Sequence, residues 1–328
     1  MMQKNDLRIV FMGTPEFAVE TLKSLVENHY SVVGVVTQPD RPVGRHGSVL
    51  QPSAVKQYAL AHNLPVLQPE KMKDPAFLDQ LQALGANLQV VVAFRMLPEA
   101  VWAMPQYGTF NVHAALLPQY RGAAPINWAI INGETQTGVT TFFLDHQIDT
   151  GRIILQRAFA IPDDADVEYV YDGLMHLGAQ LALETIEAVI AADGHPKTVA
   201  QEEAEQSSLS APLRQAPKIF KETCRIDWTL GAKPIYNFVR GLSPVPGAWG
   251  MLVAQDGRES VLKVYKTRKT DRPAEAVPGS IVVDGRSLMV ATGDHLLEIT
   301  ELQLAGKKRM TARDFLNGTK DLDQYRLR

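Results

Sequence analysis

Cysteine is almost missing from this sequence. The 328 residues contain one, Cys224, and the eight histidines are scattered without the spacing of a metal site. A single cysteine excludes a disulfide within the chain and argues against a zinc site built from thiolates. We therefore predict a protein without structural disulfides and without a bound metal.

Long apolar runs and a targeting segment are missing as well. The first residues, MMQKNDLRIVFMG, hold no long apolar region followed by a cleavage site of small residues. No apolar run approaches the roughly 20 residues that span a bilayer. These two absences predict a cytoplasmic protein with no membrane partner.

The charge is small in total but unevenly distributed. The formal net charge is −3, yet residues 1–210 hold 13 Lys and Arg against 23 Asp and Glu, whereas residues 211–328 hold 20 against 13. A basic C-terminal part suggests contact with an anion such as a phosphate backbone. A chance imbalance of solvated surface charge would give the same counts, so the pattern alone leaves both explanations open.

Apolar runs and helical patterns alternate along the first part of the chain. Leu7–Met12, Ser31–Val36 and Leu88–Ala93 are typical of buried parallel strands. After the first of them we expect Thr14 to cap a helix whose first position is Pro15. Such alternation predicts a doubly wound α/β domain that binds ligands at the carboxyl ends of its strands.

Glycine is scarce where a dinucleotide cofactor would need it. The turn after the first strand, FMGTPEF, has one glycine instead of the three-glycine fingerprint that lets a backbone approach a pyrophosphate. The Rossmann-like beginning therefore does not predict a nicotinamide or flavin cofactor.

The second part of the chain has a different sequence pattern. Asp166–Ala192 is typical of one long helix, and the polar residues 195–215 are typical of a linker, so we place the domains at residues 1–206 and 207–328. Short β-like runs separated by Gly, Pro and Asp then predict a small barrel or sandwich. These runs are Leu262–Tyr265, Gly279–Val283, Leu288–Thr292 and Leu296–Thr300.

Three side chains could carry chemistry. Asn111 and His113 lie two residues apart in an expected strand, so they point to the same side of the sheet. Asp149 lies in an expected turn between two strand-like stretches, Val139–Leu144 and Ile153–Phe159. Taken singly, such a histidine is more often a satisfied core residue than a catalyst, and an aspartate in such a turn is more often a backbone cap.

Together the three side chains suit acyl transfer. When an amine attacks a formyl group, negative charge builds on the carbonyl oxygen. The amide of Asn111 and a protonated His113 could donate hydrogen bonds to that oxygen. Asp149 could orient the imidazole and help to remove the proton of the attacking amine. Cys224 lies far away in the sequence, so no thiol mechanism is predicted.

The motifs around these residues resemble those of folate-dependent formyltransferases. The sequence shows an asparagine-x-histidine pair, an LLP corner, an RGAAPI run and an aspartate-threonine-glycine turn that begins 36 residues after the histidine. Within that superfamily FMGTPEFAV, TQPDRPVGR, FKETCRIDW, GLSPVPGAW and LQLAGKKRM resemble the methionyl-tRNA formyltransferases. The resemblance extends over nearly the whole chain.

The resemblance implies a fold, a donor and a set of site residues. It implies a Rossmann-like formyltransferase domain followed by a small OB-like β-barrel, and 10-formyltetrahydrofolate as the formyl donor. Asn111, His113 and Asp149 would be catalytic. The folate would meet the segment Ala115, Leu116, Leu117 and Pro118, which has alanine where the family has serine, and also Phe94, Arg95, Met96 and Leu97.

The same resemblance implies contacts with methionyl initiator tRNA, for translation initiation. The loop Asp40–Ser53 would reach the acceptor end through Arg41 and Arg45. The basic C-terminal domain would add Lys266, Arg268, Lys307 and Lys308. The loop has His46, Gly47 and Ser48 where lysines are common in the family, so we expect a shallower dependence of this contact on salt.

Two other functions fit part of the pattern. A formyltransferase acting on an amino sugar or another small amine would need the same three side chains but no basic domain. An RNA-binding protein with a decayed enzyme domain would need the basic domain alone, and the intact trio argues against it. The resemblance further implies a monomer, although no feature of the residues encodes the oligomeric state.

Overall fold

A computed structural model gives the fold of the chain and describes residues 2–43, 49–207, 212–319 and 321–328. Contacts divide the chain into two compact units, each made of several segments. The first unit comprises Met1–Gly122, Thr137–Phe159 and Tyr171–Gln215, and the second comprises Ala123–Gln136, Ala160–Val170 and Ala216–Arg328.

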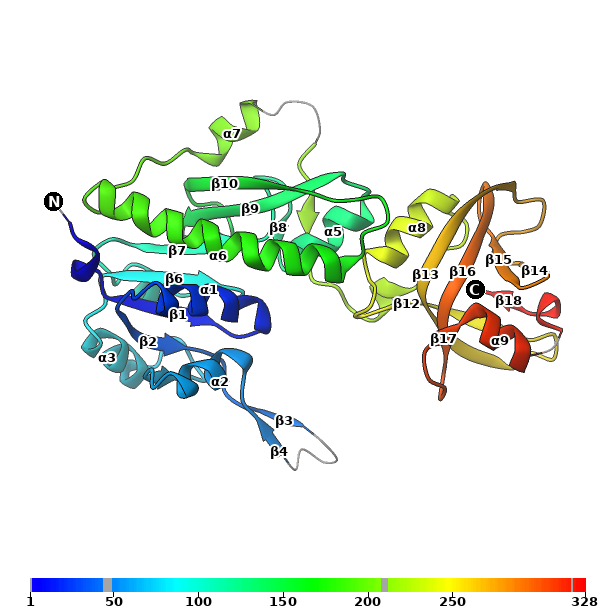
Figure 1. Cartoon of the computed structure of the whole chain (residues 1–328), viewed down its shortest axis with the longest axis horizontal. Helices are drawn as coiled ribbons and strands as arrows, with labels where there is room; N and C mark the ends of the chain where they lie inside the picture. The colour runs from blue at the N-terminus through cyan, green and yellow to red at the C-terminus, as the bar shows by residue number, and fades with distance from the viewer. Residues whose placement is uncertain (1, 44–48, 208–211, 320) are drawn as a thin grey trace. The chain divides into compact units, whose positions relative to one another are not determined.

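The first unit is built on a seven-stranded sheet in the order β10-β9-β7-β6-β1-β2-β5 (Figure 1). Strands β1, β2, β5, β6 and β7 pair in parallel, and β9 pairs with β7 in the antiparallel sense. The strand bounds are β1 Ile9–Gly13, β2 Val32–Val36, β5 Val66–Leu67, β6 Leu88–Val92, β7 Thr109–His113, β9 Gln136–Phe143 and β10 Ile153–Ala160. The predicted parallel α/β domain is thus confirmed.

The topology of this sheet determines where a ligand can bind. Strand β1 pairs with β2 on one side and with β6 on the other, so the order of the strands reverses at β1. In open α/β sheets the crevice outside the carboxyl ends of the strands at such a switch point is the usual ligand site. The residues that follow β1, β6 and β7 therefore border the expected site.

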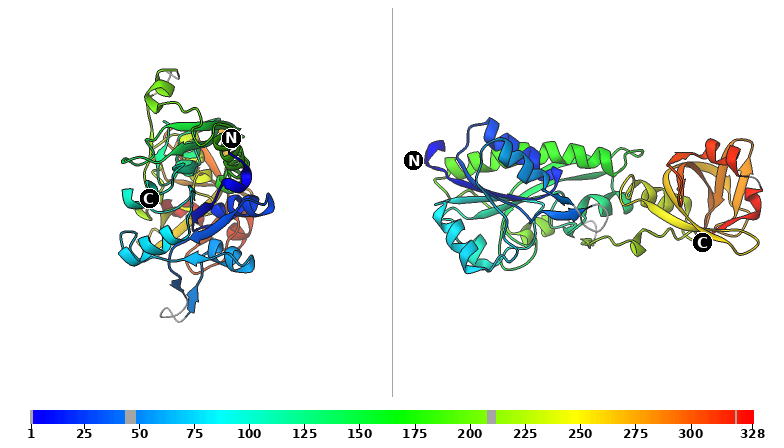
Figure 2. Two further views of the ribbon diagram at one scale, coloured as in Figure 1. Left: turned by 90° about the vertical axis from the view of Figure 1, so that its left-hand side faces the viewer. Right: turned by 90° about the horizontal axis from the view of Figure 1, so that it is seen from below.

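Helices cover both faces of the sheet in the first unit (Figure 2). On one face Val10, Met12 and Val91 pack against Phe77 of α3 and Val101 of α4. On the other face α6 approaches β7 and β9, because a Cβ placed on Gly178 would lie 3.2 Å from Val112. The helix bounds are α1 Glu16–Glu27, α2 Ala54–Ala61, α3 Pro75–Ala83, α4 Glu99–Trp102, α6 Val167–Ala191 and α7 Gln201–Ser207.

Helix α6 is the one described segment with the length and hydropathy of a membrane span. The expectation that no segment would reach this length and composition is wrong for α6. Its apolar side chains are explained by packing, because Val170, Leu174 and Ile186 are fully buried. The core helix of a folded domain passes the same test of length and composition as a membrane span.

Three local features of the first unit differ from the sequence expectations. Helix α1 begins at Glu16 with Pro15 as its N-cap, and the Thr14 hydroxyl finds no hydrogen-bond partner among the described residues, so the predicted threonine cap is wrong. The long loop after β2 contains a hairpin, β3 (Arg41–Val43) and β4 (Val49–Gln51), that extends from the sheet (Figure 1). The segment expected to be a linker contains helix α7.

Two very short strands also belong to this part of the chain. Strands β8 (Arg121–Gly122) and β11 (Gln215–Ala216) form a two-stranded sheet. The amide of Tyr120, just before β8, donates to the carbonyl oxygen of Arg214 at 2.7 Å. Tyr120 and Gly122 both have positive φ values, so the chain turns sharply here.

The second unit is a curled antiparallel sheet with the order β14-β15-β16-β13-β12-β18, to which β17 adds beside β16. A bridge between Ser280 and Arg326 joins the two ends of this order, so the sheet closes on itself as a barrel does. The predicted small β-barrel is confirmed. The strand bounds are β12 Ala248–Val253, β13 Glu259–Pro273, β14 Ile281–Asp284, β15 Ser287–Ala291, β16 His295–Leu304, β17 Met310–Thr311 and β18 Arg326–Leu327.

Three helices complete the second unit. They are α5 Pro125–Ile131, α8 Ala232–Arg240 and α9 Ala312–Gly318. Buried Ile235 and Val239 of α8 join the core of the barrel, and Ile131 of α5 packs against it. The short segment before α6 is held by the buried guanidinium of Arg240, which donates to the carbonyl of Ala165 at 2.8 Å.

Candidate functional site

Strand β7 presents Asn111 and His113 at its carboxyl end. They are its third and fifth residues, and the intervening Val112 points to the face that α6 covers. Because successive strand residues alternate, Asn111 and His113 face the opposite side. Asn111 is the one residue of the strand that keeps part of its surface exposed, whereas His113 is 6% exposed. An amide open to solvent and a nearly buried imidazole thus share one face.

Asp149 lies beside His113, although it belongs to a loop and His113 ends strand β7. Its carboxylate oxygen Oδ2 is 3.9 Å from Nδ1 of His113 and accepts a hydrogen bond of 2.9 Å from the amide of Gly122. The backbone of Asp149 has a φ of 57°, which residues other than glycine rarely adopt. Such conformations persist where surrounding contacts enforce them. The structure therefore brings two of the three predicted residues into direct proximity.

The tautomer of His113 follows from its second nitrogen. Nε2 lies 2.9 Å from the carbonyl oxygen of Tyr120, and a carbonyl oxygen can only accept, so Nε2 carries the proton. In this tautomer of the neutral ring Nδ1 is a hydrogen-bond acceptor. The nearest carboxylate oxygen of Asp149 lies beyond hydrogen-bond distance from it. Nδ1 remains available for a substrate atom that enters beside the carboxylate.

The segment Ala115 to Pro118 follows β7 and is held from beneath by polar side chains. The hydroxyl of Thr140 accepts from the amide of Leu117 at 3.0 Å and donates to the carbonyl of Ala115 at 2.7 Å. Gln156 donates to the carbonyl of Leu117 at 2.6 Å. Ala115, Leu117 and Pro118 are buried and Leu116 is partly exposed. The path of this backbone is thus fixed, and its role in folate binding stays a prediction.

The segment Phe94 to Leu97 follows β6, the strand between β7 and β1. Met96 is 74% exposed, whereas Leu97 is buried with Phe94 packed against the same cluster. Arg95 donates to the backbone carbonyls of Glu70 and Pro69, and burial lowers the pKa of its guanidinium. An exposed thioether beside a fixed backbone is what a flat ring could pack on. The predicted folate contact here also remains a prediction.

The hairpin β3–β4 carries one of the two arginines predicted to contact tRNA. Arg41 is exposed at the start of β3, where its guanidinium donates to the side chain of Gln38 at 2.7 Å. Next to it, a hydrogen bond from Lys56 lowers the pKa of Asp40, and Gln68 donates to the same carboxylate. These bonds anchor the base of the hairpin. Arg45 lies outside the described residues.

The predicted basic residues of the second unit differ in their pairing. Lys266 is 3.3 Å from Glu301, and Arg268 is 2.5 Å from Glu298 on the neighbouring strand β16. Within the described part of the chain, Lys307 and Lys308 form no ion pair. Two of the four predicted cations are therefore already neutralised inside the unit, and all four assignments stay predictions.

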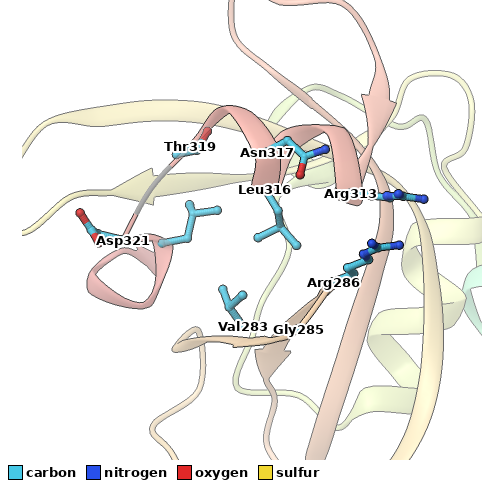
Figure 3. A pocket seen from close by; sticks show the side chains of 9 residues that line it. Val283, Gly285, Arg286, Arg313, Leu316, Asn317, Thr319 and Asp321 are labelled. Carbon is cyan, nitrogen blue, oxygen red and sulfur yellow. The ribbon is translucent and has the colours of Figure 1, made fainter.

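A cavity in the second unit holds two arginines that the sequence reasoning missed. It has a volume of about 250 Å³ and is lined by Arg286 after β14 and Arg313 of α9, together with Asn317 and Asp321. Figure 3 shows the two arginines on one side of this cavity and Asp321 on the other. Neither arginine has an ion pair among the described residues. Their sequence neighbourhoods carry no motif, so only their charge could have suggested them.

The single cysteine of the sequence, Cys224, belongs to the second unit, whereas Asn111, His113 and Asp149 belong to the first. Burial raises the pKa of the Cys224 thiol, which lies in the core of the second unit. No group of three or more His, Cys, Asp or Glu side chains that could hold a metal is present among the residues that the structure describes. The chemistry at hand is that of hydrogen-bond donors and a carboxylate–histidine pair.

Comparison with known proteins agrees with this picture. The family model for formyl transferases matches residues 7–186, and that for the formyl transferase C-terminal domain matches residues 218–320. A solved sugar 3N-formyl transferase, WlaRD, has the same fold, with a TM-score of 0.62 at 18% identity over 92% of this chain and 99% of that one. HypX from Aquifex aeolicus in complex with tetrahydrofolic acid gives a TM-score of 0.60 at 18% identity, over 94% of this chain and 47% of that chain.

Fold and site thus define an enzyme of the formyl transferase class. Curated relatives refine this result. A methionyl-tRNA formyltransferase of Parabacteroides distasonis is 61% identical over 327 residues, 99% of either chain, and one of Flavobacterium johnsoniae is 46% identical over 98% of this chain and 99% of its own. The chain belongs to the methionyl-tRNA formyltransferase family.

Proposed function

We propose that this chain transfers the formyl group of 10-formyltetrahydrofolate to the amino group of methionyl initiator tRNA. The observation that carries the proposal is the approach of Asp149 Oδ2 to His113 Nδ1, at the carboxyl end of β7, in a chain that matches methionyl-tRNA formyltransferases over its length. With this tRNA substrate it would be an enzyme of translation initiation in the cytoplasm, and the resemblance to the family implies a monomer.

The proposed reaction is a direct acyl transfer. The methionyl amine attacks the formyl carbon, and the carbonyl oxygen of the tetrahedral intermediate becomes negatively charged. The side-chain amide of Asn111 and the Nδ1–H of protonated His113 donate hydrogen bonds to this oxygen. Because His113 is nearly buried, these bonds are weakly screened by water.

The remaining steps concern protons. Asp149 stabilises the imidazolium and receives the proton that the attacking amine releases. Collapse of the intermediate breaks the bond between the formyl carbon and N10 of the folate, and N10 takes up a proton. The products are formyl-methionyl-tRNA and tetrahydrofolate. The groups that these steps use are an amide, an imidazole and a carboxylate.

The substrates are assigned to separate surfaces. The pterin ring would lie at the carboxyl ends of β6 and β7, between Phe94–Leu97 and the segment Ala115–Pro118. The loop Asp40–Ser53, whose sequence includes Arg41 and Arg45, would contact the acceptor end of the tRNA. In the second unit Lys266, Arg268, Lys307 and Lys308 would contact phosphates, and the two arginines of the cavity, Arg286 and Arg313, join them because their charges are unpaired within the described structure.

A formylation assay tests this function. Purified protein would be mixed with 10-formyltetrahydrofolate and one acceptor, and formyl-methionine would be measured after release from the tRNA. Methionyl initiator tRNA should be formylated far faster than methionyl elongator tRNA or an amino sugar nucleotide. Turnover of the amino sugar without turnover of initiator tRNA would refute the proposal. Addition of a chelator should leave the rate unchanged.

A further inference from the structure

A buried glutamine joins the two loops on which Asp149 depends. Gln201, the first residue of α7, is 0% exposed. Its Nε2 donates hydrogen bonds of 2.9 Å to the backbone carbonyls of Asp149 and of Gly151. Its Oε1 accepts from both Nε and Nη2 of Arg121, at 2.9 and 2.7 Å. All four bonds link segments that are far apart in the sequence.

These bonds hold both the backbone around Asp149 and the loop that contacts its carboxylate. The two carbonyls flank Thr150, so Gln201 holds the backbone of the turn in which Asp149 adopts its positive φ. Arg121 directly precedes Gly122, whose amide donates to the carboxylate of Asp149. Gln201 therefore fixes the backbone that carries the carboxylate and also the loop whose amide orients it.

The type of residue matters at this position. A glutamine has two N–H donors on one atom and an acceptor on the other, which is what two carbonyls and one guanidinium require. A glutamate would keep the acceptor for Arg121 but would place a carboxylate oxygen against two carbonyl oxygens. A methionine of similar shape would leave the carbonyls and the guanidinium without these partners. Buried polar groups that lose their partners are costly.

We propose that Gln201 is a positioning residue for formyl transfer, which holds the Asp149 carboxylate in place beside His113. The proposal rests on the proposed function of this site. Residue 201 lies between the two regions that the formyl transferase models match, 7–186 and 218–320. It also lies in the segment that the sequence predicts to be a linker.

The first test compares Gln201→Met and Gln201→Glu with Glu202→Gln, a substitution of the exposed neighbour on α7. We expect kcat to fall by about 10- to 100-fold in both Gln201 variants, because small displacements of a catalytic group cost rates of this order. The KM for folate should change little, and Glu202→Gln should keep the activity of the wild type. A kcat close to that of the wild type in both Gln201 variants would overturn the proposal.

A double-mutant cycle separates positioning from general damage to the fold. If Gln201 acts through Asp149, then Gln201→Met should lower kcat much less in an Asp149→Asn background than in the wild type. If the double variant instead loses kcat by the product of the two single losses, Gln201 does not act through this carboxylate.

A third measurement does not depend on turnover. Hydrogen–deuterium exchange followed by mass spectrometry should show faster exchange in the peptides around residues 119–124 and 145–155 in Gln201→Met than in Glu202→Gln. Unchanged exchange there would contradict the proposal even if kcat fell. If the wild-type protein formylates no tRNA, the proposed function fails, whereas the exchange result still decides whether Gln201 holds the two loops.

Discussion

The loops of the first unit that carry the proposed catalytic residues and the basic surface of the second unit use polar groups in opposite ways. His113, Asp149 and Gln201 are buried or nearly so, and their polar atoms meet backbone groups at fixed distances. Lys266 and Arg309 are partly exposed and share the carboxylate of Glu301. Exposed pairs of this kind contribute about 0–1 kcal/mol, so they exchange partners easily.

The difference has a functional consequence. An acyl-transfer site needs one geometry, and buried hydrogen bonds enforce it because leaving them unmade is costly. A surface that binds a phosphate backbone needs charge that can move toward its ligand, and the counterions released on binding supply much of the affinity. Substitutions in the two regions should therefore differ in size and in kind.

The largest effect is expected from the catalytic trio. Alanine at Asn111 or His113, or asparagine at Asp149, should lower kcat by roughly 100-fold or more, since each removes an oxyanion donor or an acid–base group. His176→Ala serves as a matched control, because its side chain is 61% exposed on α6. Single-turnover assays would measure the rates. A His113→Ala enzyme that works at full speed would contradict the assigned role.

A smaller effect is expected beneath the segment Ala115–Pro118. Thr140→Val removes the hydroxyl that bonds the amide of Leu117 and the carbonyl of Ala115, and should cost about 1–3 kcal/mol of unfolding free energy. It should also raise the KM for folate.

The matched control for Thr140 lies on the same strand. Thr137 is buried and its hydroxyl has no hydrogen-bond partner within the described part of the chain, so Thr137→Val should leave stability unchanged or raise it. Denaturant titrations and folate titrations would measure both variants. Equal losses from the two substitutions would show that the bonds of Thr140 are not what holds the segment.

The basic surface should respond through binding rather than through chemistry. Replacing Arg286 and Arg313 by alanine should raise the KM for tRNA and leave kcat unchanged. The slope of log K against log salt concentration should fall in magnitude by roughly 1 for each cation that is removed. Arg258→Ala is the matched control, because that arginine already pairs with Asp256. Filter binding at several salt concentrations would decide the matter. An unaltered slope would show that the tRNA does not contact these two arginines.

The smallest effect concerns the stability of the second unit. Asp294 accepts a hydrogen bond of 2.7 Å from the amide of Ala232, at the start of α8, where the N-cap Gly231 has no side chain. This backbone hydrogen bond lowers the pKa of Asp294. Asp294→Ala should destabilise the unit by about 1 kcal/mol, as the loss of a helix cap does.

The pH dependence of this contribution has a definite sign. A carboxyl whose pKa is lowered in the folded state stabilises the fold above its unfolded pKa, and this stability disappears as the pH falls through the folded pKa. The difference in Tm between wild type and Asp294→Ala should thus be present at neutral pH and vanish in strong acid. Asp284→Ala, which removes an exposed pair with Arg272, is the control. A difference that persists in acid would rule out the charge as its cause.

Much of the fold could be predicted from short-range pattern. The mostly apolar runs at Leu7–Met12 and Leu88–Ala93 became β1 and β6 because a strand buried on both faces needs a nearly continuous apolar run. The same reasoning found α6 to within a residue at each end. It failed at Thr14, because Pro15 takes the N-cap position, and at residues 195–215, where polar composition concealed α7.

The candidate site could be predicted in part for the same reason. Asn111 and His113 share a face because they are two residues apart on one strand, and this follows from strand geometry alone. That Asp149 would meet His113 was suggested by the chemistry and by resemblance, while their separation of 3.9 Å comes from the structure. The pairing of Lys266 and Arg268 with β16 could not be foreseen, since it depends on the register of two strands.

By itself the sequence determined which segments form strands and helices and which residue types stand ready for acyl transfer, because these depend on neighbours a few positions away. The tertiary structure alone decided which distant groups meet. Gln201 reaches Asp149 across 52 positions, and Gly122 reaches the same carboxylate across 27. Hydrogen bonds between residues so far apart in the sequence form only when the chain has folded. No periodic pattern in the sequence identifies their partners.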